Sequence, residues 1–110
     1  MPYKVPSSNF GRLLRRYRKE RGFKQKEVEA LLHDLQFNMS PGLVSKYELG
    51  KIRPSPEFVY YVSVVLELVD DETSALRAAH FADTTITFMN EYSEVEKRAT
   101  KKKRQEENLG

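Results

Sequence analysis

The stretch SPGLVSKYELGKIRPS, residues 40–55, contains the start and stop signals of a short helix and the start of another. Ser40 followed by Pro41 is typical of a helix start, because a hydroxyl cap and a proline at the first helical position suit the free N–H groups there. Gly50 predicts the end of this helix, and the prolines that follow predict the cap of the next. A helix this short is not stable alone in water. We therefore expect it to dock on its neighbours through one face and to leave the other face free for a partner.

Two amphipathic helices are predicted upstream of residue 40. Apolar side chains recur there at intervals of three and four residues, which is the period of a helix with one buried face. The first helix is expected to begin at Ser8 or Asn9 and to end at Gly22, and the second to begin near Gln25. The two apolar stripes are Phe10, Leu13, Leu14 and Tyr17, and Val28, Leu31, Leu32 and Leu35.

Downstream, residues 56–68 predict a helix that is apolar almost all the way round. An acidic start signal at residue 70 predicts a further helical stretch, in which the β-branched run TTIT, residues 84–87, is a candidate break. The basic tail offers no apolar face to pack and is expected to be disordered. We therefore expect an all-α chain with three parts: a domain at residues 1–69, a C-terminal helical segment at 70–99 and a disordered tail at 100–110.

Charge is distributed in blocks along the chain, although the formal net charge is only +3. Residues 1–53 carry 12 Lys and Arg against 5 Asp and Glu, residues 54–96 carry 1 against 9, and residues 97–110 carry 6 against 2. A basic N-terminal half before an acidic middle suits a protein that presents one face to a polyanion. A solvated charged surface without a nucleic-acid partner is the alternative.

Composition argues against metal, covalent and membrane chemistry. The chain has no cysteine, and neither of its two histidines, His33 and His80, has a second ligand at metal spacing. No stretch approaches the roughly 18 apolar residues of a membrane-spanning helix, and the N-terminus lacks the apolar core of a signal peptide. We therefore expect no metal, no cofactor, no enzymatic activity, no membrane partner and a cytoplasmic location.

Two runs of the sequence resemble a known family. RRYRKERGFKQKEVEALL, residues 15–32, and the stretch at 40–55 resemble the lambda-repressor-like family of phage repressors, Cro-type proteins and bacterial XRE-type regulators. The resemblance covers roughly residues 9–68 and implies an all-α, five-helix lambda-repressor-like DNA-binding domain with an added C-terminal helical segment. In such a domain the second helix of the helix-turn-helix motif enters the major groove of DNA.

The resemblance also implies which residues face DNA. Gln25 would meet a phosphate at the positive end of the first motif helix, and Ser40 would cap the recognition helix and bond another phosphate. Lys46 is the leading candidate for sequence reading, since a lysine can donate to O6 and N7 of guanine. Arg18 and Glu48 match an internal ion pair of the family. The implied DNA-binding residues are Gln25, Ser40, Pro41, Gly42, Ser45, Lys46, Tyr47, Lys51 and Arg53.

Three features depart from the family pattern. The connection between the second and third helices is several residues longer than usual, and Glu29 stands where alanine is common. Pro41 and Gly42 replace longer polar side chains that often read bases. We therefore expect the shape of the DNA to carry part of the specificity.

Apolar residues outside the motif predict an interface. Tyr61 and Val64 fall where the family carries exposed polar residues, so we expect the C-terminal stretch to cover them, by folding back or by exchange across a two-fold axis. Apolar residues from Phe88 to Ala99 recur at heptad-type spacing, which pairs helices. The core stripe of a monomer is the alternative. The predicted interface residues are Tyr61, Val64, Phe88, Tyr92 and Val95.

Together these features predict a sequence-specific transcriptional regulator, a repressor that binds a palindromic operator in double-stranded DNA as a homodimer. The alternative is an antitoxin or adaptor whose C-terminal helices bind a protein partner, with DNA binding secondary. An RNA-binding protein has only the basic patch in its favour, because no aromatic platform for stacking bases is visible.

Overall fold

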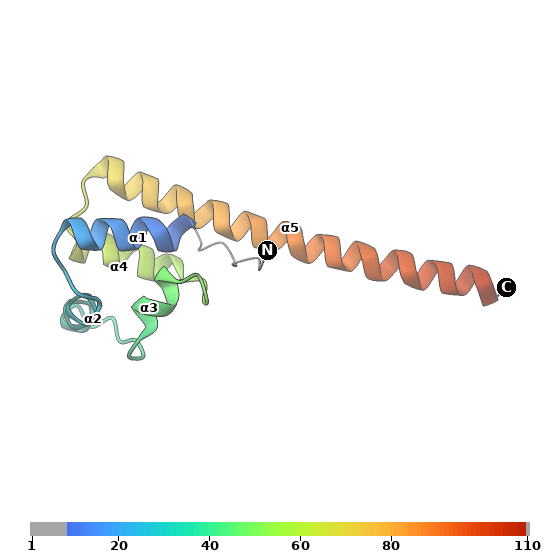
Figure 1. The fold of residues 1–110 in the computed structure, drawn as a ribbon, viewed down its shortest axis with the longest axis horizontal. Coiled ribbons are helices and arrows are strands. Elements are labelled where there is room, and N and C mark those ends of the chain that lie inside the picture. Colours follow the sequence, from blue (N-terminus) through green and yellow to red (C-terminus); the bar gives the residue numbers. More distant parts are fainter. Residues whose placement is uncertain (1–8, 110) are drawn as a thin grey trace, which may run out of the picture.

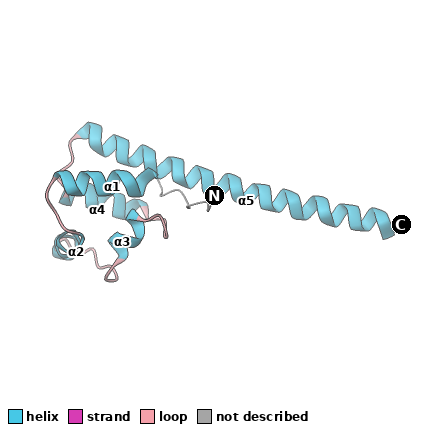
Figure 2. Cartoon of the chain, viewed as in Figure 1, coloured by secondary structure: helices cyan, strands magenta, loops and turns pink. Residues whose placement is uncertain are grey.

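The computed structural model describes residues 9–109, with side chains described for residues 9–100. Within that range helices, joined by loops and turns, are the only regular secondary structure (Figures 1 and 2). Five helices follow one another: α1 Asn9–Glu20, α2 Gln25–Asp34, α3 Leu43–Glu48, α4 Pro56–Val65 and α5 Asp70–Leu109. The first part of α5 lies along α1, and the rest projects away as a single helix (Figure 1). We call residues 9–83 the head and residues 84–109 the arm. The predicted all-α class is confirmed.

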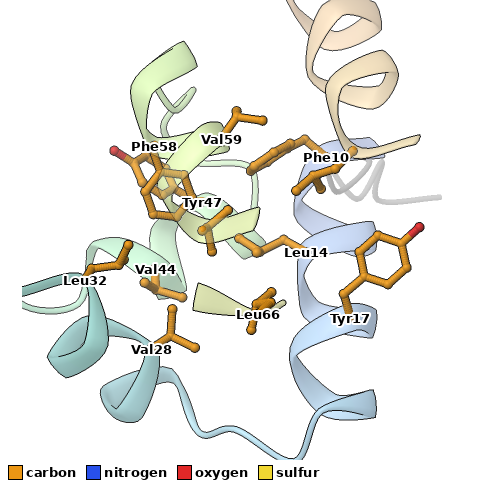
Figure 3. Packing of buried hydrophobic residues seen from close by; sticks show 12 residues of the cluster. Phe10, Leu14, Tyr17, Val28, Leu32, Val44, Tyr47, Phe58, Val59 and Leu66 are labelled. Carbon is orange, nitrogen blue, oxygen red and sulfur yellow. The ribbon is translucent and has the colours of Figure 1, made fainter. Parts of the chain in front are cut away.

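The hydrophobic core lies where α1 to α4 meet the start of α5 (Figure 3). Phe10 and Phe58 meet edge to face at its centre, with their ring centroids 6.3 Å apart. Burying each large side chain here stabilises the head by about 1.5–3 kcal/mol. The core residues are Phe10, Leu14, Tyr17, Val28, Leu32, Val44, Tyr47, Phe58, Val59, Val62, Leu66 and Leu76.

The four helices α1 to α4 end in the same backbone motif. In each case the second residue after the helix has a positive φ. The N–H groups of this residue and of the next one donate to carbonyl oxygens in the last turn of the helix. Gly22 and Gly50, predicted from the sequence as stops, hold this position after α1 and α3. Gln36 and Glu67 hold it after α2 and α4, with φ angles of 63° and 52°.

The start of α3 corrects the prediction that Ser40 caps this helix and that Pro41 is its first residue. The helix begins two residues later, and Gly42 is its cap, with φ 80° and ψ 0°. The Leu43 N–H donates to the Ser40 carbonyl over 3.3 Å, so residues 40–43 form a type II turn. Proline and glycine are the preferred residues at the two central positions of that turn, which explains why this start signal was misread.

The helix α5 corrects two further predictions. The run TTIT does not break it, because the hydroxyls of Thr84, Thr85 and Thr87 each donate to the carbonyl four residues earlier, over 2.9–3.0 Å. Residues 100–109, expected to be disordered, continue the same helix to Leu109. Between residues 70 and 109 the sequence has no glycine or proline, and its Lys, Arg, Gln and Glu residues are good helix formers.

Three polar contacts fasten the first half of α5 to the head. The Asp83 carboxylate accepts from the N–H groups of Asn9 and Phe10, over 3.1 and 3.0 Å, and so caps the start of α1. Arg21 donates to Glu72 with both terminal nitrogens, one of them over 2.9 Å. His80 Nε2 lies 2.8 Å from the Pro54 carbonyl oxygen. Packing therefore changes near residue 84, inside the predicted C-terminal helical segment at 70–99.

In the part of the chain that the structure describes, no helix combines the length and the apolar character needed to cross a membrane.

Candidate nucleic-acid interface

The helices α2 and α3 form the helix-turn-helix pair, and α3 is docked through one of its faces. Val44 is fully buried, and Tyr47 and Glu48 are buried beside it. On the other side, Pro41, Gly42 and Lys46 are exposed, and Ser45 is half-buried. The exposed side is the one expected to face DNA, so the structure brings these four residues together on one short segment.

A buried charge network holds α3 against α1. The Arg18 guanidinium donates to both carboxylate oxygens of Glu48, from Nε over 2.6 Å and from a terminal nitrogen over 2.9 Å. Its other terminal nitrogen donates to the Phe23 carbonyl over 2.8 Å. The predicted internal ion pair is confirmed, and its geometry is bidentate, which fixes the orientation of both side chains. This pair sets the angle at which α3 is presented.

Gln25 joins this network from the first turn of α2. Its Nε2 donates to Oε1 of Glu48 over 3.1 Å, and its side chain is half-buried. The start of α2 is therefore linked directly to the last turn of α3. Glu27 completes the start of α2 by accepting from the Lys24 N–H over 2.9 Å. The phosphate contact of Gln25 stays a prediction, but its amide nitrogen also has a structural partner.

The long connection between α2 and α3, residues 35–42, packs into the head instead of looping outward. Phe37 lies against Phe58, with centroids 6.3 Å apart, and against Tyr61, with centroids 5.0 Å apart. This corrects the expectation that the C-terminal stretch covers Tyr61, because the extra residues of the connection supply the covering ring. Val64, on the same helix, is 47% exposed.

Glu29 secures the other end of this connection. Its Oε1 accepts from the Gly42 N–H over 2.9 Å, so the carboxylate is anchored at the turn that begins α3. A glutamate at this position is therefore explained by the longer connection, whose turn needs an acceptor. It also places a negative charge beside the predicted base-reading side chains, where it opposes a close approach of phosphates.

Three basic side chains are exposed on α3 and the loop that follows it: Lys46, Lys51 and Arg53. The loop is held to α3 by the Lys51 N–H, which donates to the Lys46 carbonyl over 2.9 Å. The Arg53 guanidinium lies 5.7 Å from the ring centroid of Phe88, at a distance typical of a cation–π contact. The arm therefore takes part in positioning one of the predicted phosphate contacts.

Tyr47 differs from the other predicted DNA contacts because its ring is in the core. It is 7% exposed and packs on Phe58 with centroids 4.4 Å apart (Figure 3). Burial raises the pKa of its phenol above the ordinary value of 10.0. The expected packing of the ring is observed, and the phosphate contact of its hydroxyl stays a prediction.

The predicted interface residues do not form one surface. Tyr61 and Val64 lie on α4 in the head, whereas Phe88, Tyr92 and Val95 lie on the arm that leaves it (Figure 1). The three arm residues are 49%, 71% and 60% exposed. An interface at Tyr61 and Val64 would therefore be separate from one on the arm.

Sequence reasoning missed the part that several residues play at this site. Asp83 and Phe88 act on residues far away in the sequence, so no local pattern indicates that they hold Asn9 and Arg53. For Glu29 a signal existed, since its departure from the family pattern coincides with the longer connection. Among the described residues, no group of three or more His, Asp and Glu is placed to hold a metal ion.

Comparison with known proteins agrees with this geometry. Residues 9–76 match the helix-turn-helix domain family, which is of the Cro/XRE-like type. The matched stretch covers α1 to α4 and ends at Leu76, the residue of α5 that is fully buried in the core. No curated protein and no solved structure matches the chain. The family match covers the core of the head and leaves out the arm.

Proposed function

This chain belongs to the helix-turn-helix family of the Cro/XRE-like type, and on that premise we propose that it is a transcriptional repressor that binds a palindromic operator as a homodimer. The observation that carries the proposal is the presentation of α3. Val44 and Glu48 dock this helix firmly, while Lys46 is exposed. A docked short helix with an exposed basic side chain suits insertion into the major groove.

The proposed contacts divide into two roles. Gln25, Ser40, Lys51 and Arg53 position the protein on the phosphate backbone, and Ser45 and Lys46 read base edges. Bound across a promoter, the protein would block or recruit other factors. It would act in the cytoplasm, without a cofactor and without catalysing a reaction.

Direct base reading is limited by the start of α3. Pro41 and Gly42 occupy a turn and have no polar side-chain atoms. The Glu29 carboxylate is held at the same turn by the Gly42 N–H. The number of side chains able to read bases is therefore small. We infer that sequence-dependent DNA shape contributes to operator choice.

The test is DNA binding by the Lys46→Ala variant. Loss of a base contact should cost about 1–3 kcal/mol of binding free energy at the operator and less at scrambled DNA. Operator candidates are taken from the DNA upstream of the protein's own gene, and affinity is measured across a salt series. Lys97→Ala is the matched control, because it removes the same charge from the arm and should leave the specificity ratio unchanged.

Equal losses of binding free energy on operator and scrambled DNA would mean that Lys46 contacts phosphate and does not read a base. Weak binding of the unaltered protein to both DNAs, with a steep loss on adding salt, would contradict the repressor proposal. The second candidate would then be favoured: an antitoxin or adaptor that binds a protein partner through the arm. The exposed apolar residues Phe88, Tyr92 and Val95 support that candidate.

A further inference from the structure

The arm carries an exposed apolar stripe along one side of α5. Leu76 and Asp83 define the inward face of α5, since the first is fully buried and the second caps α1. Phe81 is 71% exposed and lies on the opposite, outward face of α5, in the part of the helix that packs on α1. The exposed stripe continues along that face at intervals of three and four residues as Thr85, Phe88, Tyr92, Val95 and Ala99. Phe88 meets the head at Arg53, whose guanidinium lies 5.7 Å from its ring centroid, yet it is 49% exposed. Tyr92 and Val95 farther along are 71% and 60% exposed, so the stripe is open to a second helix.

The spacing assigns heptad positions to the arm. If Tyr92 and Ala99 are a positions, then Phe88 and Val95 are d positions. The charged residues that flank this seam are Glu91 and Arg98 at g positions and Glu96 at an e position. These flanking charges decide which orientation of a second copy is compatible with the seam.

A parallel pair of arms is disfavoured by its flanking charges. In parallel pairs a g residue meets the e residue five positions later in the other chain, so Glu91 would face Glu96 of the second copy. Symmetry would repeat this like-charge contact. In an antiparallel pair g residues meet g residues, so Glu91 can face Arg98 of the second copy, and the contact again occurs twice.

We propose that the arm pairs with a second copy of this chain in the antiparallel orientation, with the two-fold axis passing between residues 93 and 94. In this register Tyr92 packs against Val95 of the second copy, and Phe88 packs against Ala99, a large residue against a small one. A shift of one heptad either way brings Glu91 opposite Glu91, or Arg98 opposite Arg98. Charge and side-chain size therefore favour the same register.

The inference rests on the homodimer of the proposed function and specifies its geometry. An antiparallel pair carries its two heads at opposite ends. With a rise of 1.5 Å per residue, the two copies of Leu76 lie roughly 50 Å apart along the helices. That span exceeds the ~34 Å between half-sites on consecutive turns of DNA, so we expect operator half-sites separated by more than one turn.

The first experiment changes the flanking charges and measures the dimer dissociation constant by sedimentation equilibrium without DNA. Glu91→Arg and Arg98→Glu each replace two attractive contacts with two repulsive ones, so each should weaken the dimer on the order of tenfold. The double variant restores opposite charges and should recover most of the affinity. In a parallel pair, Glu91→Arg would instead face Glu96 and tighten the dimer.

Matched controls place the same charge changes on the far side of the helix. Glu94→Arg and Lys97→Glu lie away from the seam, where both side chains are exposed and pair with each other at 3.8 Å. Neither should change the dissociation constant by more than about twofold. Circular dichroism of every variant checks that the arm stays helical.

The second experiment uses cysteine, which the natural chain lacks. In the antiparallel register two Ala99 residues lie about 16 Å apart along the helices, too far for a disulfide. Ala99→Cys alone should therefore stay uncrosslinked under mild oxidation. A mixture of Ala99→Cys and a size-tagged Phe88→Cys chain should give the mixed covalent dimer.

A covalent dimer of Ala99→Cys alone, or a tighter dimer of Glu91→Arg, would overturn the antiparallel pairing. A chain that stays monomeric at high concentration would overturn the pairing altogether and leave the stripe to a protein partner. Because these measurements contain no DNA, they fail or succeed independently of operator binding.

Discussion

Residues 70–83 and residues 84–100 belong to one unbroken helix, but different interactions surround them. The inner part contributes Leu76 to the core and fastens itself through Glu72, His80 and Asp83. The outer part leaves Phe88, Met89 and Tyr92 between 49% and 71% exposed. The continuity of the helix is therefore a local property of the sequence. Whether each half of the helix is buried or exposed depends instead on the contacts that it makes with the rest of the chain.

The difference teaches where stability and where association are encoded. An isolated helix is only marginally stable in water, so the arm gains most from covering its stripe. The head already has a core and a buried charge network. Substitutions in the head should thus change the free energy of unfolding, and substitutions in the arm should change association instead.

The largest expected effect is on the buried pair that joins α1 to α3. Arg18→Ala leaves the Glu48 carboxylate buried without its cation, which should cost about 3–5 kcal/mol in the free energy of unfolding. Urea unfolding measures the loss. Arg16→Ala is the control: Arg16 forms an exposed pair with Glu20 at 3.0 Å, and removing it should cost no more than about 1 kcal/mol. Similar losses in the two variants would contradict the structural role of Glu48.

The next effect compares the two halves of α5 directly. Leu76→Ala opens a cavity in the core and should destabilise the head by about 2–5 kcal/mol. Val95→Ala removes an exposed apolar side chain from the arm and should change unfolding by less than about 0.5 kcal/mol in dilute protein. Urea unfolding is measured at concentrations below the dimer dissociation constant. An equal loss from Val95→Ala would show that the arm packs on its own head.

A smaller effect is expected at the contact that closes α1. Asp83→Ala removes the acceptor for two backbone N–H groups and should cost about 0.5–2 kcal/mol, as for other helix caps. Hydrogen exchange of the Asn9 and Phe10 amides gives the local readout, since both should lose protection. Glu94→Ala, an exposed carboxylate on the arm, should leave those two amides unchanged. Unaltered protection in Asp83→Ala would contradict the cap.

The smallest effect is a pH dependence at Glu72. The two-pronged hydrogen bond from Arg21, and then the Val69 N–H, lower the pKa of this carboxyl below its ordinary value of 4.5. Its contribution to stability is therefore present above pH 4.5 and is lost as the pH falls through the lowered pKa. Tm should drop more steeply with acid in the natural protein than in Glu72→Gln. If Tm fell equally with pH in the two proteins, the Arg21–Glu72 contact would not contribute to the acid sensitivity of the fold.

Much of the head was predictable because its signals are local. Helical spacing located stripes such as Phe10 to Tyr17. The prolines after Gly50 predicted a cap for the next helix, and between them Ser55 caps α4 by accepting from the Phe58 N–H over 3.2 Å. The start of α3 was predicted wrongly because the Pro-Gly pair also suits a type II turn. The ends at Gln36 and Glu67 were not predicted, since a non-glycine residue with positive φ has no clear signature.

The candidate DNA-facing residues came from resemblance, and the structure adds what resemblance lacks. It shows Lys46 exposed and Tyr47 in the core, and it shows Phe88 stacked under Arg53. Contacts between residues far apart in the chain depend on packing, which no single-sequence pattern reveals. The same reason explains why the sequence pattern did not indicate that Phe37 covers Tyr61.

The cap of α1 has a consequence for the order in which the protein is made. Asp83 follows Asn9 by 74 residues, so α1 emerges from the ribosome long before its acceptor is synthesised. At about 5–20 residues per second, the delay is roughly 4–15 s. During that interval the N–H groups of Asn9 and Phe10 lack the Asp83 carboxylate as acceptor. The first helix to be translated is thus among the last to be capped. A fragment that stops at residue 76 lacks Asp83 and therefore never gains this cap.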